Sequence, residues 1–310
     1  MPIFDQGYQH WKGTLSGHGW RWWTVTRRGV GVALKNRWTR LLMLFAWFPA
    51  ALLIALLVAW GLIEQRSNLL APLVQAFEPL RKFAQTPRAN RLAVWRFCYD
   101  LFFQFEITFT MILVVLVGPG LVSQDLRFNA LPLYFSRPLR RFDYFAGKLG
   151  VIAVPLAAVM IVPALIAYII GVVFSLDPTV LADTFVVLLG ALTYGLVVVL
   201  SAGTLMLALS SLSRSSRAVG GLWVGIWLIG SMLAGGLTAM LKQDWCPLLS
   251  YTENIKTVGR ALLGVDPESQ LGGSLVHQPP WTWSALVLLA LMGLSVWILS
   301  LRVKSLDRLK

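Results

Sequence analysis

The stretch from Gly118 to Lys148 reads GPGLVSQDLRFNALPLYFSRPLRRFDYFAGK and separates two apolar runs that are each long enough to cross a bilayer. Five of its residues are Lys or Arg. A guanidinium group or an unpaired backbone amide finds no partner in hydrocarbon, so this stretch cannot lie in the lipid. We therefore expect it at a membrane face, and its positive charge favours the cytoplasmic face.

The composition is that of an integral membrane protein. The chain has 310 residues, of which 57% are hydrophobic and 13% are charged, whereas soluble globular proteins contain roughly 25% charged residues. A net charge of +13 would also suit a nucleic-acid-binding protein, but the basic residues are scattered between apolar runs and form no single stripe. The charge is better explained by basic loops that set the orientation in a membrane.

Six apolar runs reach the roughly 20 residues that a helix needs to cross the hydrocarbon core. They are approximately Leu41–Ile63, Leu101–Val122, Leu149–Phe174, Leu181–Leu209, Val219–Leu241 and Trp281–Leu301. We predict an all-α integral membrane protein with six transmembrane helices. If both termini are cytoplasmic, the inner segments contain 18 Lys and Arg and the outer loops contain 9, which is the bias of the positive-inside rule.

The segment before the first run, residues 1–40, is basic and rich in Trp. Its densest part, Trp20 to Trp38, predicts an amphipathic helix at the inner interface, because indole rings favour the headgroup level and arginines favour anionic lipid. A disordered basic tail is the alternative. Residues 41–310 then form the transmembrane domain, and its outer loop, 242–280, contains a predicted short helix from Tyr251 to Leu263.

A second outer loop, residues 64–100, contains six Lys or Arg, a load that the predicted topology does not explain. Apolar residues recur at helical spacing between Leu69 and Leu80, which is typical of an amphipathic helix lying flat on the surface. The two cysteines, Cys98 and Cys246, both fall on the outer side, where a disulfide is permitted. Two free apolar thiols are the alternative.

No catalytic or nucleotide-binding motif is found in the sequence. The only Gly-Lys pair, Gly147 and Lys148, lacks a glycine five residues earlier and a following Ser or Thr, so it cannot form a phosphate-binding loop. The three histidines are solitary and lie outside the predicted spans, where they suggest neither a zinc site nor a catalytic triad. We expect no enzyme activity and no cofactor or metal bound by this chain.

Glu106 is the notable charge within the predicted spans, with Gln104 and Thr108 beside it. A carboxylate at membrane depth is costly and should face protein or water, so these three residues are candidates for a translocation path or gate. The alternative is that Glu106 reaches the outer interface or pairs with a residue such as Arg96. In the fifth run, Gly221 and Gly225 are spaced for close contact between helices.

The opening stretch resembles the type 2 class of ATP-binding-cassette (ABC) transporter permeases. The resemblance rests on Gln124-Asp125-Leu126, on Ser136-Arg137-Pro138-Leu139-Arg140-Arg141, and on Tyr144-Phe145-Ala146-Gly147-Lys148. The family has an acidic residue after its second span, then Ser-Arg-Pro-x-x-Arg, then Tyr-x-x-Gly-Lys at the start of its third span. Only these thirty or so residues are specific, while the number and order of the spans agree over the whole chain.

The resemblance implies an exporter-type permease in a prokaryotic cell (inner) membrane. Such a subunit forms the substrate pathway as a dimer, with a second copy or a paralogue, and is driven by separate ATPase subunits that bind ATP and Mg²⁺. The segment between spans two and three, residues 123–148 here, is the coupling segment that contacts the ATPase. The residues expected to serve coupling are Asp125, Leu126, Arg127, Leu133, Tyr134, Arg137, Pro138, Arg140, Arg141 and Lys148.

The resemblance also assigns the dimer contact to spans one and five. Gly221 and Gly225 both lie in span five. Pro132 would break a continuous helix through the coupling segment, which predicts two short pieces. An interfacial loop that binds only lipid would explain the arginines but not the Tyr-x-x-Gly-Lys ending. The competing classes are an ATP-independent membrane transporter and a membrane scaffold protein.

Overall fold

The computed structural model describes residues 20–67, 72, 83–130, 134, 140–265 and 279–307. These residues are helices and their connections, with no strand among them. The predicted all-α class is therefore confirmed. The predicted surface helix between Leu69 and Leu80 lies outside the described residues except for Pro72.

Six helical segments of the described chain are long and apolar enough to cross a membrane, as predicted. They are Arg37–Glu64, Pro87–Arg127, Phe142–Ser175, Thr179–Leu212, Ser216–Leu241 and Trp281–Arg302. The main helices are α1 (Arg21–Ala33), α2 (Arg37–Phe45), α3 (Trp47–Glu64), α6 (Pro87–Val117), α7 (Gly120–Arg127), α9 (Arg141–Ser175), α10 (Thr179–Leu212), α11 (Ser216–Val224), α12 (Gly230–Leu241), α13 (Tyr251–Leu263) and α14 (Trp281–Asp307).

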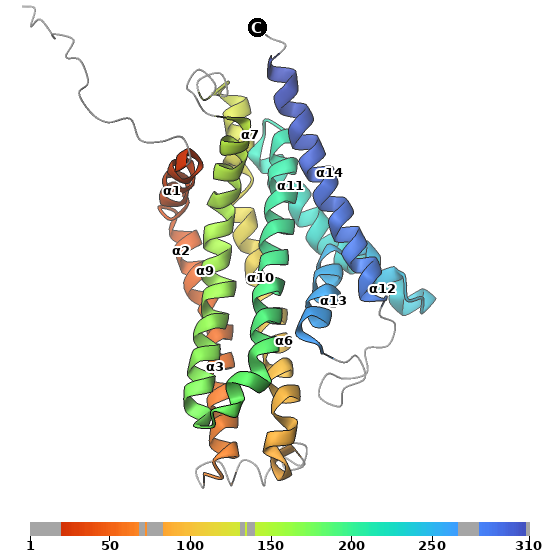
Figure 1. Cartoon of the computed structure of the whole chain (residues 1–310). Helices are drawn as coiled ribbons and strands as arrows, with labels where there is room; N and C mark the ends of the chain where they lie inside the picture. The colour runs from red at the N-terminus through yellow and green to blue at the C-terminus, as the bar shows by residue number, and fades with distance from the viewer. Residues whose placement is uncertain are drawn as a thin grey trace, which may run out of the picture.

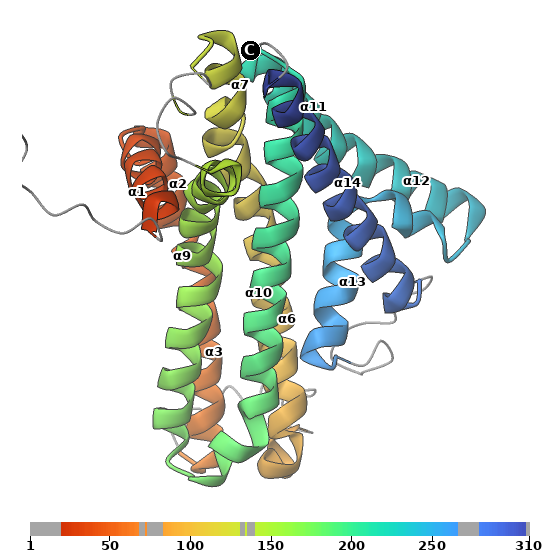
Figure 2. The ribbon, with the colours of Figure 1, turned by 45° about the horizontal axis from the view of Figure 1, so that its top comes forward.

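Four long helices, α3, α6, α9 and α10, pack side by side and enclose the core (Figure 1). Helix α9 contacts both α3 and α10, and α14 lies against α10 and α13. Helix α1 lies across the direction of the long helices, at the end of the bundle where α7 and the C-terminus also lie (Figures 1 and 2). We call this the α7 end, and the other the α3–α6 end.

At the α3–α6 end, Arg91 of α6 is only 2% exposed and uses all of its N–H groups. It donates to Glu64 Oε1 and Oε2 at 2.9 and 3.1 Å, to Asp177 Oδ2 at 3.0 Å, to Thr179 Oγ1 at 3.0 Å and to Asp183 Oδ2 at 2.7 Å. Hydrogen bonds from the Thr179 backbone and from Arg91 lower the pKa of Asp177 to about 2. One guanidinium thus joins α3, α6, α10 and the α9–α10 turn.

Arg91 also explains much of the basic load predicted for an outer loop. Helix α6 begins at Pro87 and not near Leu101, so Arg88, Arg91 and Arg96 belong to a membrane helix. The predicted start of the second span was wrong because these charges lower the local hydropathy. In the fold, two of the three arginines have acidic partners, so they can belong to the helix. Arg91 has the partners above, and Arg88 lies 3.4 Å from Asp177.

Helix α13 confirms the short helix predicted in the loop 242–280, with the predicted bounds. It packs closely against α10 because glycines bring the two backbones together: a Cβ on Gly259 would overlap the Tyr194 ring, and one on Gly190 would lie 2.4 Å from the Leu262 carbonyl oxygen. Cys246 lies just before this helix, and both Cys98 and Cys246 are buried and free. The possible disulfide is therefore not formed in this structure.

Candidate functional site

The predicted coupling segment is held to the bundle by Asp125, Tyr144 and Lys148. Lys148 Nζ, near the start of α9, lies 2.7 Å from Asp125 Oδ2 in α7, and both side chains are largely buried. Tyr144 Oη donates to the same oxygen at 2.6 Å. Asp125 precedes Tyr144 and Lys148 by about twenty positions in the sequence. In the fold these residues form one contact, which joins the end of the second span to the start of the third.

Tyr134 belongs to the same cluster. Its ring lies 5.3 Å from the Tyr144 ring, edge to face, and Lys148 Nζ lies 5.7 and 5.5 Å from the two ring centroids. This places the ammonium within cation–π distance of both rings. Burial, and then the negative charge of Asp125, raises the pKa of Tyr134. Lys148, a predicted coupling residue, is therefore bound inside this cluster.

The remaining predicted coupling residues fall into two groups. Arg127 and Arg140 are exposed and Leu126 is half-buried, so all three are available at the surface of the α7 end. Leu133, Arg137, Pro138 and the side chain of Arg141 lie outside the described residues, as does Pro132. A helix break does occur, but earlier than Pro132: α7 ends at Arg127, and Asn129 has a left-handed φ of 51°.

Helix α7 is also bound to α10 through Ser210. The chain leaves α6 at Gly118 and turns at Pro119, where the ring of proline removes a backbone donor. Ser210 Oγ donates to the Pro119 carbonyl at 2.9 Å and accepts from the backbone N–H groups of Val122 and Ser123, both at 3.0 Å. The direction in which α7 leaves the second span is therefore fixed by a hydroxyl of the fourth.

Glu106 lies in the middle of α6 and has no contact with water in this structure, its exposure being 0%. Neither carboxylate oxygen has a hydrogen-bond partner among the described residues, and the hydroxyl of Thr110, one turn further along, has none either. The suggested pairing of Glu106 with Arg96 is therefore not observed. A buried polar group without a partner is costly, so such a group in a native fold suggests a role beyond stability.

The other two predicted pathway residues do not join Glu106. Gln104 donates to Asp100 Oδ2 at 2.7 Å, and Asp100 is paired with Arg260 of α13, whose Nε lies 3.3 Å from Oδ1. Thr108 is exposed on the side of α6 away from Glu106. The sequence therefore grouped residues from different faces of α6, and a pathway or gating role for Glu106 stays a prediction.

Gly221 lies on an open surface of the fifth span. Among the described residues, a Cβ there would have no neighbour within 4 Å, and one on Gly225 would meet only Ile229 of its own span, at 3.9 Å. A π-helical turn, Gly225–Ile229, interrupts the span at this point. This face is free for another helix, and its use as a dimer contact stays a prediction.

No protein-family model matches this sequence, and no curated protein matches it. The functional assignment therefore depends on the residues themselves.

Three features of these sites were missed at the level of sequence. The partners of Arg91, the Asp100–Arg260 pair and the Ser210 contact all join residues more than 25 positions apart. Long-range pairs of this kind leave no periodic signal. The only local sign was the presence of single charges, such as Asp100, in or beside apolar runs, where an unpaired charge is disfavoured.

Proposed function

We propose that this chain is the membrane-spanning subunit of an ATP-driven exporter of the type 2 ABC class, working as a dimer with separate ATPase subunits. The observation that carries the proposal is the Asp125–Tyr144–Lys148 contact. The acid, the Tyr and the Lys of the family-like motif meet at one point, although they come from two different helices. A merely interfacial loop would need no such contact.

The contact gives the coupling segment a mechanical role. A partner that grips α7 and the chain beyond it acts directly on α9 through Lys148 and on α10 through Ser210. Exposed Arg127 and Arg140 offer charge to an acidic rim on an ATPase. Closure of two ATPases around nucleotide would then move the spans as rigid bodies, which is a common way to switch domains.

The test is co-purification from the native host with a tagged chain. We expect the wild-type chain to retain an ATPase subunit, measured by ATP hydrolysis in the eluate and by mass spectrometry. Arg127→Glu combined with Arg140→Glu should reduce the retained ATPase about tenfold or more, because charge reversal places like charges against the partner. The control is Arg40→Glu, an exposed charge on α2.

Retention of the ATPase by the double variant would contradict the coupling assignment, as would the absence of any ATPase from the wild-type eluate. Equal loss with the Arg40→Glu control would contradict it too, because the effect would then be one of total charge.

An ATP-independent, ion-coupled transporter is the second candidate, and Glu106 favours it. A fully buried carboxyl without a partner is suited to bind and release a proton or a cation during transport. This candidate predicts transport into vesicles that is driven by an ion gradient in the absence of nucleotide.

A further inference from the structure

Helix α1 has two faces of different character. Its inner face contains Trp22, Val25 and Thr26 and lies against α9. Its outer face is exposed and contains Trp23, Thr24, Arg27, Arg28, Gly31, Val32 and Lys35. Members of this second set are four residues apart in the sequence, as Trp23 and Arg27 are, so they lie on one side of the helix.

The bundle fixes the direction in which the outer face points. Thr26 is completely buried, and its hydroxyl lies 3.1 Å from the Gly147 carbonyl oxygen of α9. Gly147 and Gly150 let the helices approach: an added Cβ would lie 2.9 Å from the Trp22 carbonyl oxygen at Gly147 and 2.3 Å from Thr26 Oγ1 at Gly150. Helix α1 is thus docked across the bundle (Figure 2), and its basic residues Arg27 and Arg28 are on the exposed side.

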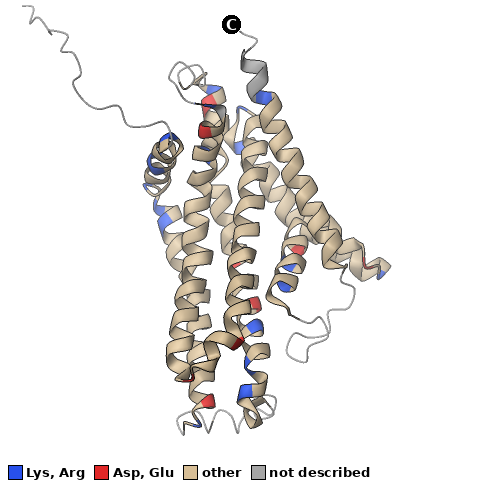
Figure 3. Ribbon diagram, in the orientation of Figure 1, with Lys and Arg blue, Asp and Glu red and all other residues tan. Residues whose placement is uncertain are grey.

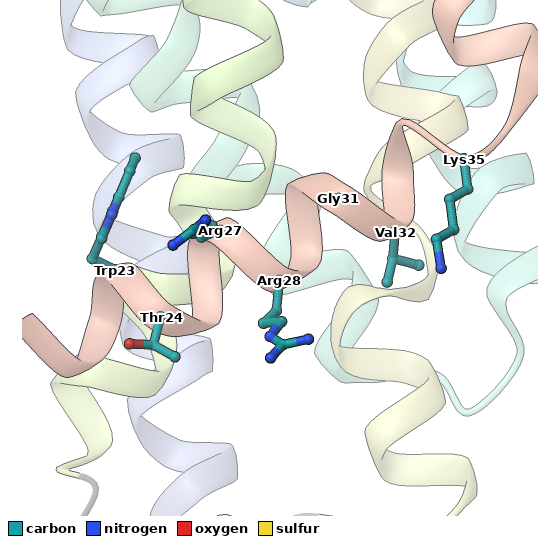
Figure 4. Close-up of a pocket in the computed structure, with 7 residues that line it drawn as sticks. All are labelled: Trp23, Thr24, Arg27, Arg28, Gly31, Val32 and Lys35. Carbon is teal, nitrogen blue, oxygen red and sulfur yellow. The ribbon is translucent and has the colours of Figure 1, made fainter.

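The outer face forms a groove of about 570 Å³. Figure 4 shows its lining, with the side chains of Trp23, Arg27, Arg28 and Lys35 spread along the helix. Helix α1 contains no acidic residue, as Figure 3 also shows. Arg27, Arg28 and Lys35 make no ion pair with any described residue. Three neighbouring cations without a counter-ion favour an anionic ligand.

We propose that this groove binds the phosphate headgroup of an anionic phospholipid at the α7 end of the bundle. Arginine is the side chain best suited to a phosphate, because its planar fork can donate two hydrogen bonds to it. Lys35 adds a further charge at one end of the groove. The docking of α1 on α9 therefore fixes where these cations lie on the surface of the bundle.

The apolar members of the groove distinguish a lipid from a soluble anion. Val32 is 67% exposed and Trp23 is 43% exposed, and in water both would be unfavourable on a cationic face. In a membrane, Trp favours the headgroup level and Val can contact the upper part of an acyl chain. A ligand with a phosphate and a hydrocarbon chain satisfies both parts of the groove.

The test measures binding of phosphatidylglycerol to the delipidated full-length chain in detergent, by native mass spectrometry. Arg27→Gln with Arg28→Gln removes two charges of the groove. Arg214→Gln with Arg217→Gln is the matched control, because it removes two exposed arginines, one in the α10–α11 connection and one at the start of α11. We expect the groove variant to bind about 30-fold more weakly, since each basic residue near anionic lipid contributes about 1 kcal/mol, and the control to bind as the wild type does.

Two competition measurements identify the ligand class. Phosphatidylcholine and inorganic phosphate should each displace phosphatidylglycerol only weakly. Equal binding by the two double variants would overturn the proposal, because the charges of the groove would then be irrelevant. Displacement by inorganic phosphate at matched concentration would overturn the lipid assignment in favour of a soluble anion, and equally tight phosphatidylcholine would show that the negative charge is not recognised. None of these measurements requires an ATPase, so their failure is distinct from failure of the proposed transport function.

Discussion

At the scale of single residues, Arg91 makes the largest number of polar side-chain contacts in the described chain. The side chain of its partner Glu64 is only 4% exposed. Five hydrogen bonds match the five donors that a guanidinium offers. Lysine has three donors on one nitrogen and cannot reproduce this arrangement. Even Arg91→Lys, which keeps the positive charge, should therefore lower the stability of the protein.

We expect Arg91→Met to lower the stability of the bundle by about 3–5 kcal/mol, because Glu64 would be left as a buried charge without its partner. Arg91→Met combined with Glu64→Gln should recover part of that loss, since Gln is neutral and still accepts the hydrogen bond from Trp60 Nε1. Thermal unfolding in detergent measures both. If the double variant is no more stable than the single one, the buried charge is not the cause.

Two carboxyl groups on α6 offer a contrast within one helix. Asp100 is paired with Arg260, whereas Glu106 has no partner among the described residues. We expect Asp100→Asn to destabilise the protein, because it leaves Arg260 without its partner. Glu106→Leu should instead raise the stability, by about 1–3 kcal/mol, because it removes an unsatisfied buried polar group.

The measurement is again thermal unfolding, together with a transport assay once a substrate is known. A function for Glu106 predicts that Glu106→Leu is stable and inactive. If Glu106→Leu unfolds at a lower temperature than the wild type, the carboxyl group has a partner in the membrane-embedded protein, and the argument from its isolation no longer applies.

At the scale of elements, the docking of α1 on α9 depends on the absence of side chains at Gly147 and Gly150. We expect Gly150→Leu to displace α1 and to increase amide hydrogen exchange over residues 21–33. Gly31→Leu is the matched control on the same pair of helices, because a Cβ at Gly31 has no neighbour within 4 Å. Equal exchange in the two variants would show that α1 is not held by this contact.

Elements also show where sequence reasoning succeeds and fails. The six spans and helix α13 were predictable because a run of apolar residues, or a break at Gly264, is a local signal. The start of α6 at Pro87 was not predictable, because charged residues such as Arg91 and Arg96 are typical of loops. Only the fold shows that Arg91 has acidic partners, Glu64 and Asp177. The position of Glu106 inside α6 was predictable, but its face and its isolation were not.

At the scale of the whole molecule, the two ends of the bundle differ in how they are connected. The α3–α6 end is joined by the buried charges around Arg91, while the α7 end is joined by hydroxyl groups and by the Asp125–Lys148 pair. Interhelical polar contacts of this kind add to the close packing that holds membrane helices together, since apolar side chains gain no hydrophobic free energy by leaving lipid for one another. The predicted coupling residues Arg127 and Arg140 are exposed at the α7 end.

Ser210 has a consequence for how motion can enter this bundle. Its oxygen bonds to the carbonyl of Pro119 and to the backbone N–H groups of Val122 and Ser123, so the first turn of α7 stays attached to α10 while these three hydrogen bonds persist. The start of α7 and this part of α10 are therefore expected to move together. In the proposed exporter, a displacement applied to α7 would reach the fourth span through Ser210 and the third span through Lys148. The compliance that alternating access requires would then lie elsewhere, and the π-helical turn of the fifth span is the first place to look.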